Sequence, residues 1–192
     1  MKRLLSLGLA VFASVAMFGQ EFRLGSPVAD FSVLDLKGNP VRFFDLKGDL
    51  SVVMFIATQC PVSNAYNERM KALQTDYAAK GVRFIAINAN STEPAAEVQS
   101  HAATHGFSFP VFKDPGNQVA DSFGAQVTPE TYLIDKSGVV LYHGSIDDSQ
   151  NPANIKVQGL RQALDAALTG GTIARAETKA FGCTIKRVKR AS

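Results

Sequence analysis

Two cysteines carry the most evident chemistry in this sequence, and Cys60 stands where a thiol becomes reactive. It lies between an apolar, β-branched run at residues 51–57 and a segment, residues 61–79, whose apolar residues recur at helical spacing. A thiol at a strand-to-helix junction meets the positive end of the helix dipole and free backbone N–H groups, which favour its thiolate form. The position predicts a redox-active cysteine, and the alternative is a buried, inert thiol.

The segment after Cys60 is expected to form a helix because its apolar residues fall on one face. These residues, spaced three or four apart, are Val62, Tyr66, Met70, Leu73 and Tyr77. Pro61 fits the first helical position, where a missing N–H costs nothing. Cys60 then becomes the N-cap residue or its neighbour.

The rest of the chain predicts a single mixed α/β domain. With 192 residues and 46% hydrophobic content, the chain can build one full core. Strands are predicted at 31–36, 41–44, 51–57, 82–88, 109–112, 131–134 and 139–143, and further helices at 93–105, 117–123 and 155–168. The first two strands flank a turn and form an N-terminal β-hairpin, and the last two form another. Residues 170–192 are expected to be a C-terminal tail that contains Cys183.

The N-terminus has the features of an export signal. Lys2 and Arg3 precede an apolar stretch at 4–18, whose small residues near its end match a signal-peptidase site. A signal peptide is predicted over residues 1–19, with cleavage after Ala16 or Gly19, and an uncleaved anchor is the alternative. Cleavage would leave no stable membrane insertion and would place both cysteines in the periplasm or outside the cell, where disulfides persist.

The net charge gives little reason to expect a nucleic-acid partner. Removal of Lys2 and Arg3 lowers the formal charge from +3 to +1. The remaining positive charge gathers at the C-terminus, on Lys186, Arg187, Lys189 and Arg190. A short basic run at the end of an exported chain is best interpreted as a solvated tail.

The order of elements resembles the thioredoxin fold over residues 28–169, with a central mixed sheet flanked by helices. Two motifs carry the resemblance: Cys60 at the start of a helix, and the segment Val127-Thr128-Pro129-Glu130 before the second hairpin. In that family the proline before the hairpin is cis and lies against the redox cysteine, and Pro129 matches this position. The resemblance implies that Thr128 and Pro129, together with Pro61 and Ser63, bind the substrate.

Within this superfamily, the chain resembles the peroxiredoxin-like redoxin branch, of the alkyl hydroperoxide reductase and thiol-specific antioxidant type. Its N-terminal extension at 28–44 is typical of that branch. The active-site segment Cys60-Pro61-Val62-Ser63 has serine where thioredoxins place a second cysteine. Peroxiredoxins have threonine or serine three residues before the cysteine and proline four residues before that, whereas this chain has Ala57 and Val53. The chain therefore resembles a redoxin with a single active-site cysteine.

A lone active-site thiolate cannot resolve its own mixed disulfide or sulfenic acid, so Cys60 needs a second thiol. Candidates are Cys183 as a resolving cysteine, a thiol of another protein, or a small thiol. Cys183 could instead form a structural disulfide or remain a free thiol in the tail. The strand before Cys60 offers no carboxylate, so activation is expected from the helix start, helped by the hydroxyls of Thr58, Ser63 and Thr128.

Other polar groups predict no metal or cofactor site. His101 and His105 have helical i, i+4 spacing but no metalloprotease motif, so they are expected at the surface. His143 is expected on a strand near the surface, and Asp147-Asp148 as a solvated acidic turn. A phosphate-binding glycine fingerprint is absent from the sequence, which argues against a dinucleotide-binding domain.

The hypothesis that best fits these patterns is an exported thiol-disulfide oxidoreductase that acts through the Cys60 thiolate without a cofactor. Its expected partner is a thiol or disulfide protein or a small thiol. A thiol peroxidase that reduces peroxide is the alternative among enzymes. A redox-inert module is the alternative outside them; it would hold an extended peptide beside Thr128-Pro129 and keep its cysteines in a structural disulfide.

Overall fold

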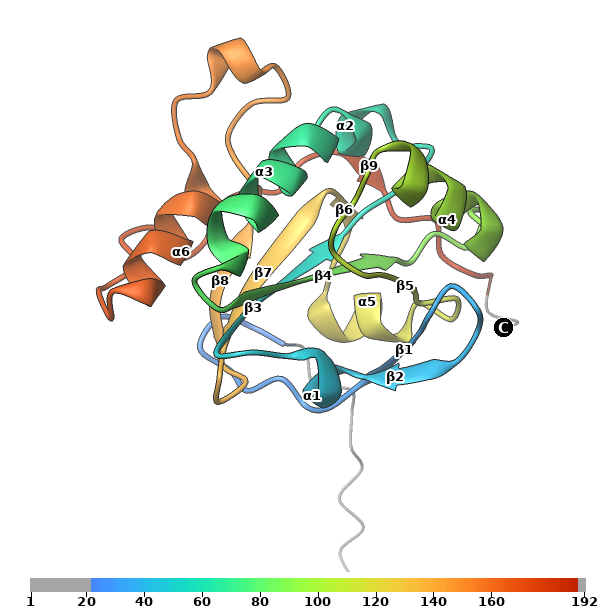
Figure 1. Cartoon of the computed structure of the whole chain (residues 1–192), viewed down its shortest axis with the longest axis horizontal. Helices are drawn as coiled ribbons and strands as arrows, with labels where there is room; N and C mark the ends of the chain where they lie inside the picture. The colour runs from blue at the N-terminus through green and yellow to red at the C-terminus, as the bar shows by residue number, and fades with distance from the viewer. Residues whose placement is uncertain (1–21, 190–192) are drawn as a thin grey trace, which may run out of the picture.

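The apolar run before Cys60 forms the centre of the fold. The computed structural model describes residues 22–189, in which strand β3 (Leu50–Phe55) is buried along its whole length. It pairs in parallel with β4 (Val82–Asn88) and antiparallel with β7 (Glu130–Asp135). Helices cover both faces of this sheet, which explains why its central strands are apolar on both sides (Figure 1).

The mixed sheet has the strand order β2-β1-β5-β4-β3-β7-β8. Its other strands are β1 (Ser32–Leu34), β2 (Pro40–Arg42), β5 (Val111–Lys113) and β8 (Val140–Gly144). The predicted N-terminal hairpin is confirmed, since β1 and β2 pair antiparallel at one edge of the sheet. A second, two-stranded sheet joins β6 (Val127–Thr128) to β9 (Cys183–Thr184).

Helices cover the two faces unequally. Their bounds are α1 (Phe43–Leu46), α2 (Pro61–Asn64), α3 (Asn67–Ala78), α4 (Ala95–Thr104), α5 (Gln118–Phe123) and α6 (Gly159–Leu168), with a 3-10 turn at Pro152–Asn154. One face packs against α3, α4 and α6, and the other against α1 and α5 (Figure 1). Among residues 22–189, none of these helices is long and apolar enough to cross a membrane.

Two helix predictions need correction. The helix expected at 61–79 is broken after α2, where the Tyr66 N–H donates to the Ser63 carbonyl oxygen. Tertiary contacts fix this break, because the Tyr66 hydroxyl donates to Asp147 and the Arg69 guanidinium lies 3.6 Å from the centre of the Tyr66 ring. The last helix begins at Gly159 rather than at residue 155, because the chain before it is an extended connection.

The predicted C-terminal tail lies against the domain, and we call residues 170–189 the C-terminal strap. The strap passes β8, crosses the end of the sheet beside α2 and continues toward α4 (Figure 1). A Cβ atom on Gly182 would overlap the Thr128 carbonyl oxygen, so glycine permits the close approach. Farther along, Arg187 pairs with Asp121 instead of being solvated. The predicted signal peptide and Arg190 lie outside the described residues.

Candidate redox site

Cys60 is the N-cap residue of α2, as the sequence pattern predicts for the start of a helix. Its backbone is extended, Pro61 follows in the first turn, and its sulfur accepts the Ser63 N–H at 3.3 Å. The residue is only 3% exposed. Because α2 spans four residues, the local N–H group of Ser63, rather than the dipole of a long helix, gives the main support for a thiolate.

A disulfide joins Cys60 to Cys183 across 123 residues of sequence. The Cα atoms are 5.8 Å apart, within the usual range for a disulfide. Pairing between β6 and β9 sets this distance, since Cys183 lies opposite Thr128 in the antiparallel register. The Thr128 carbonyl oxygen, in turn, lies 3.4 Å from the Cys60 sulfur.

The residues that the resemblance assigns to substrate binding surround this disulfide. The Thr128-Pro129 peptide bond is cis. Thr128, Pro129 and Ser63 are buried, whereas Pro61 is exposed. The edge of β6, where an extended peptide was expected, is occupied by the chain's own strand β9.

The hydroxyl groups predicted to assist Cys60 bind elsewhere. Ser63 Oγ accepts the Ala57 N–H at 3.1 Å, and Thr58 Oγ1 donates to Glu97. Thr128 Oγ1 donates to the Cys183 carbonyl oxygen. In this structure these hydroxyls bind the loops around the disulfide, and the hydrogen bonds of the Cys60 sulfur go to backbone groups of Ser63 and Thr128 instead.

A buried carboxylate that the sequence analysis did not single out holds the loop before Cys60. Glu93 accepts the N–H groups of Thr58 and Gln59, at 2.8 and 3.1 Å. The side-chain amides of Asn88 and Asn90 also donate to Glu93. We call Thr58, Asn88, Asn90, Glu93 and Lys113 the Glu93 cluster.

Lys113 supplies the positive charge of this cluster. Its ammonium group donates to Asn88 Oδ1 and to the carbonyl oxygens of Asn90 and Glu93. Burial lowers the pKa of Lys113, opposed by the nearby carboxylates, of which Glu93 acts most strongly. Burial alone would raise the pKa of Glu93, but its N–H donors outweigh this effect and hold the pKa below its ordinary value.

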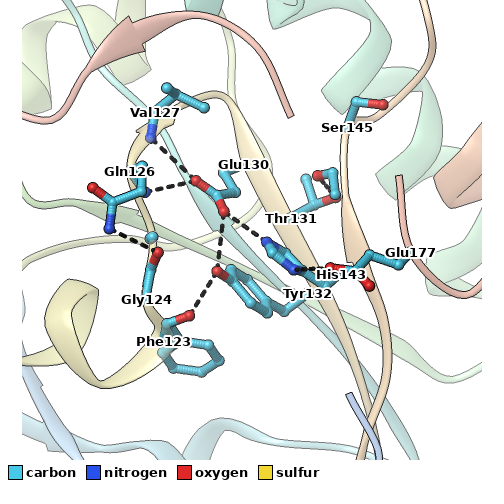
Figure 2. Close-up of polar contacts among 12 residues, drawn as sticks. Phe123, Gly124, Gln126, Val127, Glu130, Thr131, Tyr132, His143, Ser145 and Glu177 are labelled. Carbon is cyan, nitrogen blue, oxygen red and sulfur yellow. Dashed lines mark hydrogen bonds and ion pairs between the residues drawn. The ribbon is translucent and has the colours of Figure 1, made fainter. Parts of the chain in front are cut away.

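A second buried carboxylate, that of Glu130, binds the segment that leads into β6, the strand that pairs with Cys183. Figure 2 shows the polar contacts of this carboxylate. Glu130 follows the cis proline, and one of its oxygens accepts the N–H groups of Gln126 and Val127, at 2.8 and 3.1 Å. Its other oxygen accepts the Tyr132 hydroxyl and bonds His143 Nε2 at 2.6 Å. We call Gln126, Val127, Glu130, Tyr132 and His143 the Glu130 cluster.

The Glu130 cluster reaches the strap through His143. The imidazole is stacked on the Tyr132 ring, and its Nδ1 lies 3.8 Å from Glu177 (Figure 2). Burial would raise the pKa of Glu130, but the bonds from His143, Gln126 and Val127 lower it overall. His143 lies on β8 with a side chain that is 28% exposed, in agreement with the expected strand position near the surface, and it is also joined to a buried carboxylate, which the sequence did not indicate.

Glu93, Lys113 and Glu130 could have been suspected from the sequence. Glu130 opens a run that is otherwise uncharged up to Asp135, and Lys113 follows the apolar run at 109–112. A charged residue in such a run must find partners or remain at the surface. The sequence gives no means of identifying those partners.

Other predicted polar positions lie away from the disulfide. His101 Nε2 bonds Asn64 Oδ1 at 2.9 Å, and burial with neighbouring His105 lowers the pKa of His101. Asp147 is buried rather than solvated, because Arg69 and Tyr66 bind its carboxylate. Over residues 22–189, the structure contains no cluster of three or more His, Cys, Asp or Glu side chains suited to a metal ion.

Comparison with known proteins gives a consistent family assignment. Residues 24–143 match the AhpC/TSA family. The thiol-disulfide oxidoreductase ResA of Halalkalibacterium halodurans is 34% identical over 119 residues, which are 62% of this chain and 66% of that protein. ResA of Geobacillus thermodenitrificans is 31% identical over 71% of this chain and 78% of that protein.

Solved structures extend the similarity to the fold. An uncharacterized conserved protein from Geobacillus kaustophilus superimposes with a TM-score of 0.82 and 34% identity, over 88% of this chain and 95% of that one. A putative thiol:disulfide interchange protein DsbE from Chlorobium tepidum superimposes with a TM-score of 0.65 and 26% identity, over 77% of this chain and 99% of that one. Peroxidoxin BcpB from Mycobacterium tuberculosis superimposes with a TM-score of 0.62 and 25% identity, over 78% of this chain and 98% of that one.

Proposed function

Since the chain belongs to the AhpC/TSA family and is an oxidoreductase with a thioredoxin-like fold, we propose that Cys60 and Cys183 form its redox centre. In this proposal the protein is an exported thiol-disulfide oxidoreductase that acts through the Cys60 thiolate, with Cys183 as the resolving cysteine. The observation that carries the proposal is the disulfide between an N-cap cysteine and a cysteine of the strap. In this proposal Cys183 of the strap acts as the second cysteine, because Ser63 occupies the position where thioredoxins have theirs.

The chemistry of the pair is a two-electron exchange. A dithiol partner gives two electrons and two protons to the Cys60–Cys183 disulfide, and the partner's sulfurs become a disulfide in return. In the opposite direction, the reduced pair converts a partner's disulfide to two thiols. The Ser63 N–H group favours the thiolate form of Cys60 in either direction.

Export to the periplasm or the cell exterior is part of the proposal. It is supported by the apolar N-terminal stretch after Lys2 and Arg3 and by the presence of a disulfide, since disulfides persist in oxidising compartments. The partners proposed are thiol or disulfide proteins and small thiols.

Peroxide reduction is a second candidate, which the AhpC/TSA match favours. Ala57 and Val53 stand where peroxiredoxins have their hydroxyl residue and proline, and both are buried and apolar. We therefore propose slow oxidation of Cys60 by peroxide. Stopped-flow mixing of the reduced protein with hydrogen peroxide tests this point: a rate far above that of a simple thiolate of similar pKa would favour the peroxidase.

The reduction potential of the disulfide tests the main proposal. Equilibration with glutathione or dithiothreitol redox buffers, followed by alkylation and mass measurement, should give a value between about −120 and −270 mV. Oxidation of a dithiol peptide should be lost in Cys60→Ser and in Cys183→Ser. A potential below about −300 mV with no turnover would leave the redox-inert binding module as the better description.

A further inference from the structure

A cavity of about 770 Å³ lies at the end of the sheet opposite the disulfide. The parallel strands β3, β4 and β5 begin beside it, whereas Cys60 follows the far end of β3. Figure 1 shows the same separation, with α1 near one end of the sheet and α2 near the other. Small-molecule sites have volumes of about 300–1,000 Å³, so this cavity is large enough to be one.

Basic side chains from three separate elements line the cavity. Lys47 precedes β3, Arg83 lies on β4, and Lys136 lies in the turn between β7 and β8. Asp49 supplies the one lining carboxylate, which leaves the lining with a net charge of +2. Over residues 22–189, the exposed side chains of Arg83 and Lys136 have no hydrogen-bond or ion-pair partner. They can therefore bind an anion without giving up a contact.

An exposed aromatic ring stands beside these charges. Phe44 is 43% exposed and also lines the cavity. Lys47 holds its ring, since the ammonium group lies 5.2 Å from the ring centre and donates to the Lys136 carbonyl oxygen at 2.7 Å. Phe84 and Phe109, both buried, add apolar surface to the lining. An exposed ring held in this way offers a surface on which a flat, apolar group can stack.

We infer that this cavity binds a small organic anion, in which a carboxylate, sulfonate or phosphate group is attached to a flat, apolar body. The anionic group pairs with Arg83 and Lys136, and the flat body packs against Phe44. A guanidinium suits this role, because it can donate two parallel N–H groups to the oxygens of such an anion. The site is independent of the proposed function, since none of its lining residues belongs to the redox centre.

Anilinonaphthalene sulfonate is a suitable probe, because it joins a sulfonate to aromatic rings and becomes fluorescent in apolar surroundings. Phenylnaphthylamine, which lacks the sulfonate, is the matched control probe. Titration of the oxidised full chain should show one site that binds the sulfonate at least about fivefold more tightly than the uncharged probe. Equal affinities would mean that apolar surface alone binds the probes, and they would overturn the inference.

Removal of two cations tests where the anionic group binds. Arg83→Ala combined with Lys136→Ala should weaken binding of the sulfonate about fivefold or more and leave the affinity for the uncharged probe unchanged. Lys37→Ala combined with Lys156→Ala is the matched control, since it removes two exposed cations outside the cavity. Unchanged binding in the first variant, or equal weakening in both, would overturn the inference.

A third variant tests the aromatic contact. Phe44→Ala should weaken binding of both probes several-fold, because each loses the ring on which it stacks. Leu24→Ala is the matched control, since Leu24 is also 43% exposed but does not line the cavity. Unchanged binding in Phe44→Ala would overturn the inference.

NMR spectra of the isotope-labelled chain locate the bound probe. Addition of the sulfonate should shift the amide signals of Gly48 and Gly81, which line the cavity, and leave the signal of Cys60 in place. Shifts concentrated around Cys60 would place the probe at the redox centre and would overturn the inference while leaving the proposed function intact.

Discussion

The Glu93 and Glu130 clusters brace the same disulfide from two sides by different means. Each centres on a buried carboxylate that accepts N–H groups of two consecutive residues in a loop. Glu93 binds the loop that leads into Cys60, while Glu130 binds Gln126 and Val127 at the start of β6, the strand that pairs with Cys183. The fold thus fixes the two cysteines through separate elements.

The partners of the two carboxylates differ in their exposure to solvent. Lys113 in the Glu93 cluster is 7% exposed. His143 in the Glu130 cluster has a side chain that is 28% exposed, and it also faces Glu177 of the strap. The charged groups of the Glu93 cluster are therefore shielded from solvent and depend on one another for stabilisation. In the Glu130 cluster, by contrast, water can replace some of the hydrogen bonds.

Replacement of Glu93 should have the largest effect. Glu93→Ala removes the acceptor of two loop N–H groups and the negative charge that offsets the burial of the Lys113 ammonium. Loss of one member of such a buried charge pair costs about 3–5 kcal/mol of unfolding free energy. Urea denaturation of the oxidised protein measures it. Glu68→Ala is the control, because Glu68 is exposed and pairs with Lys71 at the surface, and it should change stability by less than about 0.5 kcal/mol.

Removal of the Lys113 charge as well shows whether the cost of Glu93→Ala comes from the lysine. If Lys113 is the reason for the large cost, Glu93→Ala combined with Lys113→Met should recover at least about 1 kcal/mol relative to Glu93→Ala alone. A double variant as unstable as the sum of the two single variants would show that the lysine and the carboxylate do not depend on each other.

Glu130→Ala should cost less, about 1–3 kcal/mol, because the groups it leaves behind either keep another partner or are exposed enough to bond water. The Tyr132 hydroxyl keeps its bond to the Phe123 carbonyl oxygen, and His143 can turn to water. The loss should concentrate at β6, so the amide protons of Gln126 and Val127 should exchange faster while those of Thr58 and Gln59 do not. Faster exchange at both loops would contradict the separation of the two clusters.

The sequence was sufficient for the fold and the position of Cys60, because both rest on local patterns. The apolar β3 run and the helical spacing after Pro61 are visible without tertiary information. The carboxylates could not be placed in this way, since Glu93 binds a loop 34 residues earlier in the chain. The prediction that Asp147 is solvated was wrong for the same reason, because Arg69 and Tyr66, which bind its carboxylate, come from a distant helical region.

The same limit applies to the strap. Two cysteines suggested a pair, with Cys183 favoured as the partner of Cys60, but the sequence left a structural disulfide and a free thiol open as alternatives. The path of residues 170–189 depends on pairing with β6 and on contacts with Asn90 and Asp121. These partners lie 50 or more residues away, and no short-range signal encodes them.

Low pH should reduce the stability that both clusters contribute, because Glu93 and Glu130 become protonated. The pKa values of Glu93 and Glu130 lie below the ordinary value of 4.5, so the unfolded chain binds more protons in this range and stability rises with pH. Their stabilisation is complete above pH 4.5 and is lost as the pH falls through the lowered values, with a slope of at most about 1.4 kcal/mol per pH unit for each group. Glu93→Gln and Glu130→Gln should each reduce the slope of unfolding free energy between pH 5 and 3. A slope identical to that of the unmodified chain would contradict the assignment.

His143→Gln should have the smallest effect and gives the sharpest comparison with Lys113. Glutamine can still donate to Glu130, so the change removes the stacking of the imidazole on Tyr132 and keeps a hydrogen bond to the carboxylate. Because the His143 side chain is partly exposed, we expect a loss of about 0–1 kcal/mol and an unchanged exchange rate at Thr58. Lys113→Met, by contrast, leaves the buried Glu93 without its cation and should cost several times more. Equal costs in these two variants, measured by urea denaturation at pH 7, would mean that the Glu130 cluster is as closed as the Glu93 cluster and that solvent exposure does not separate them.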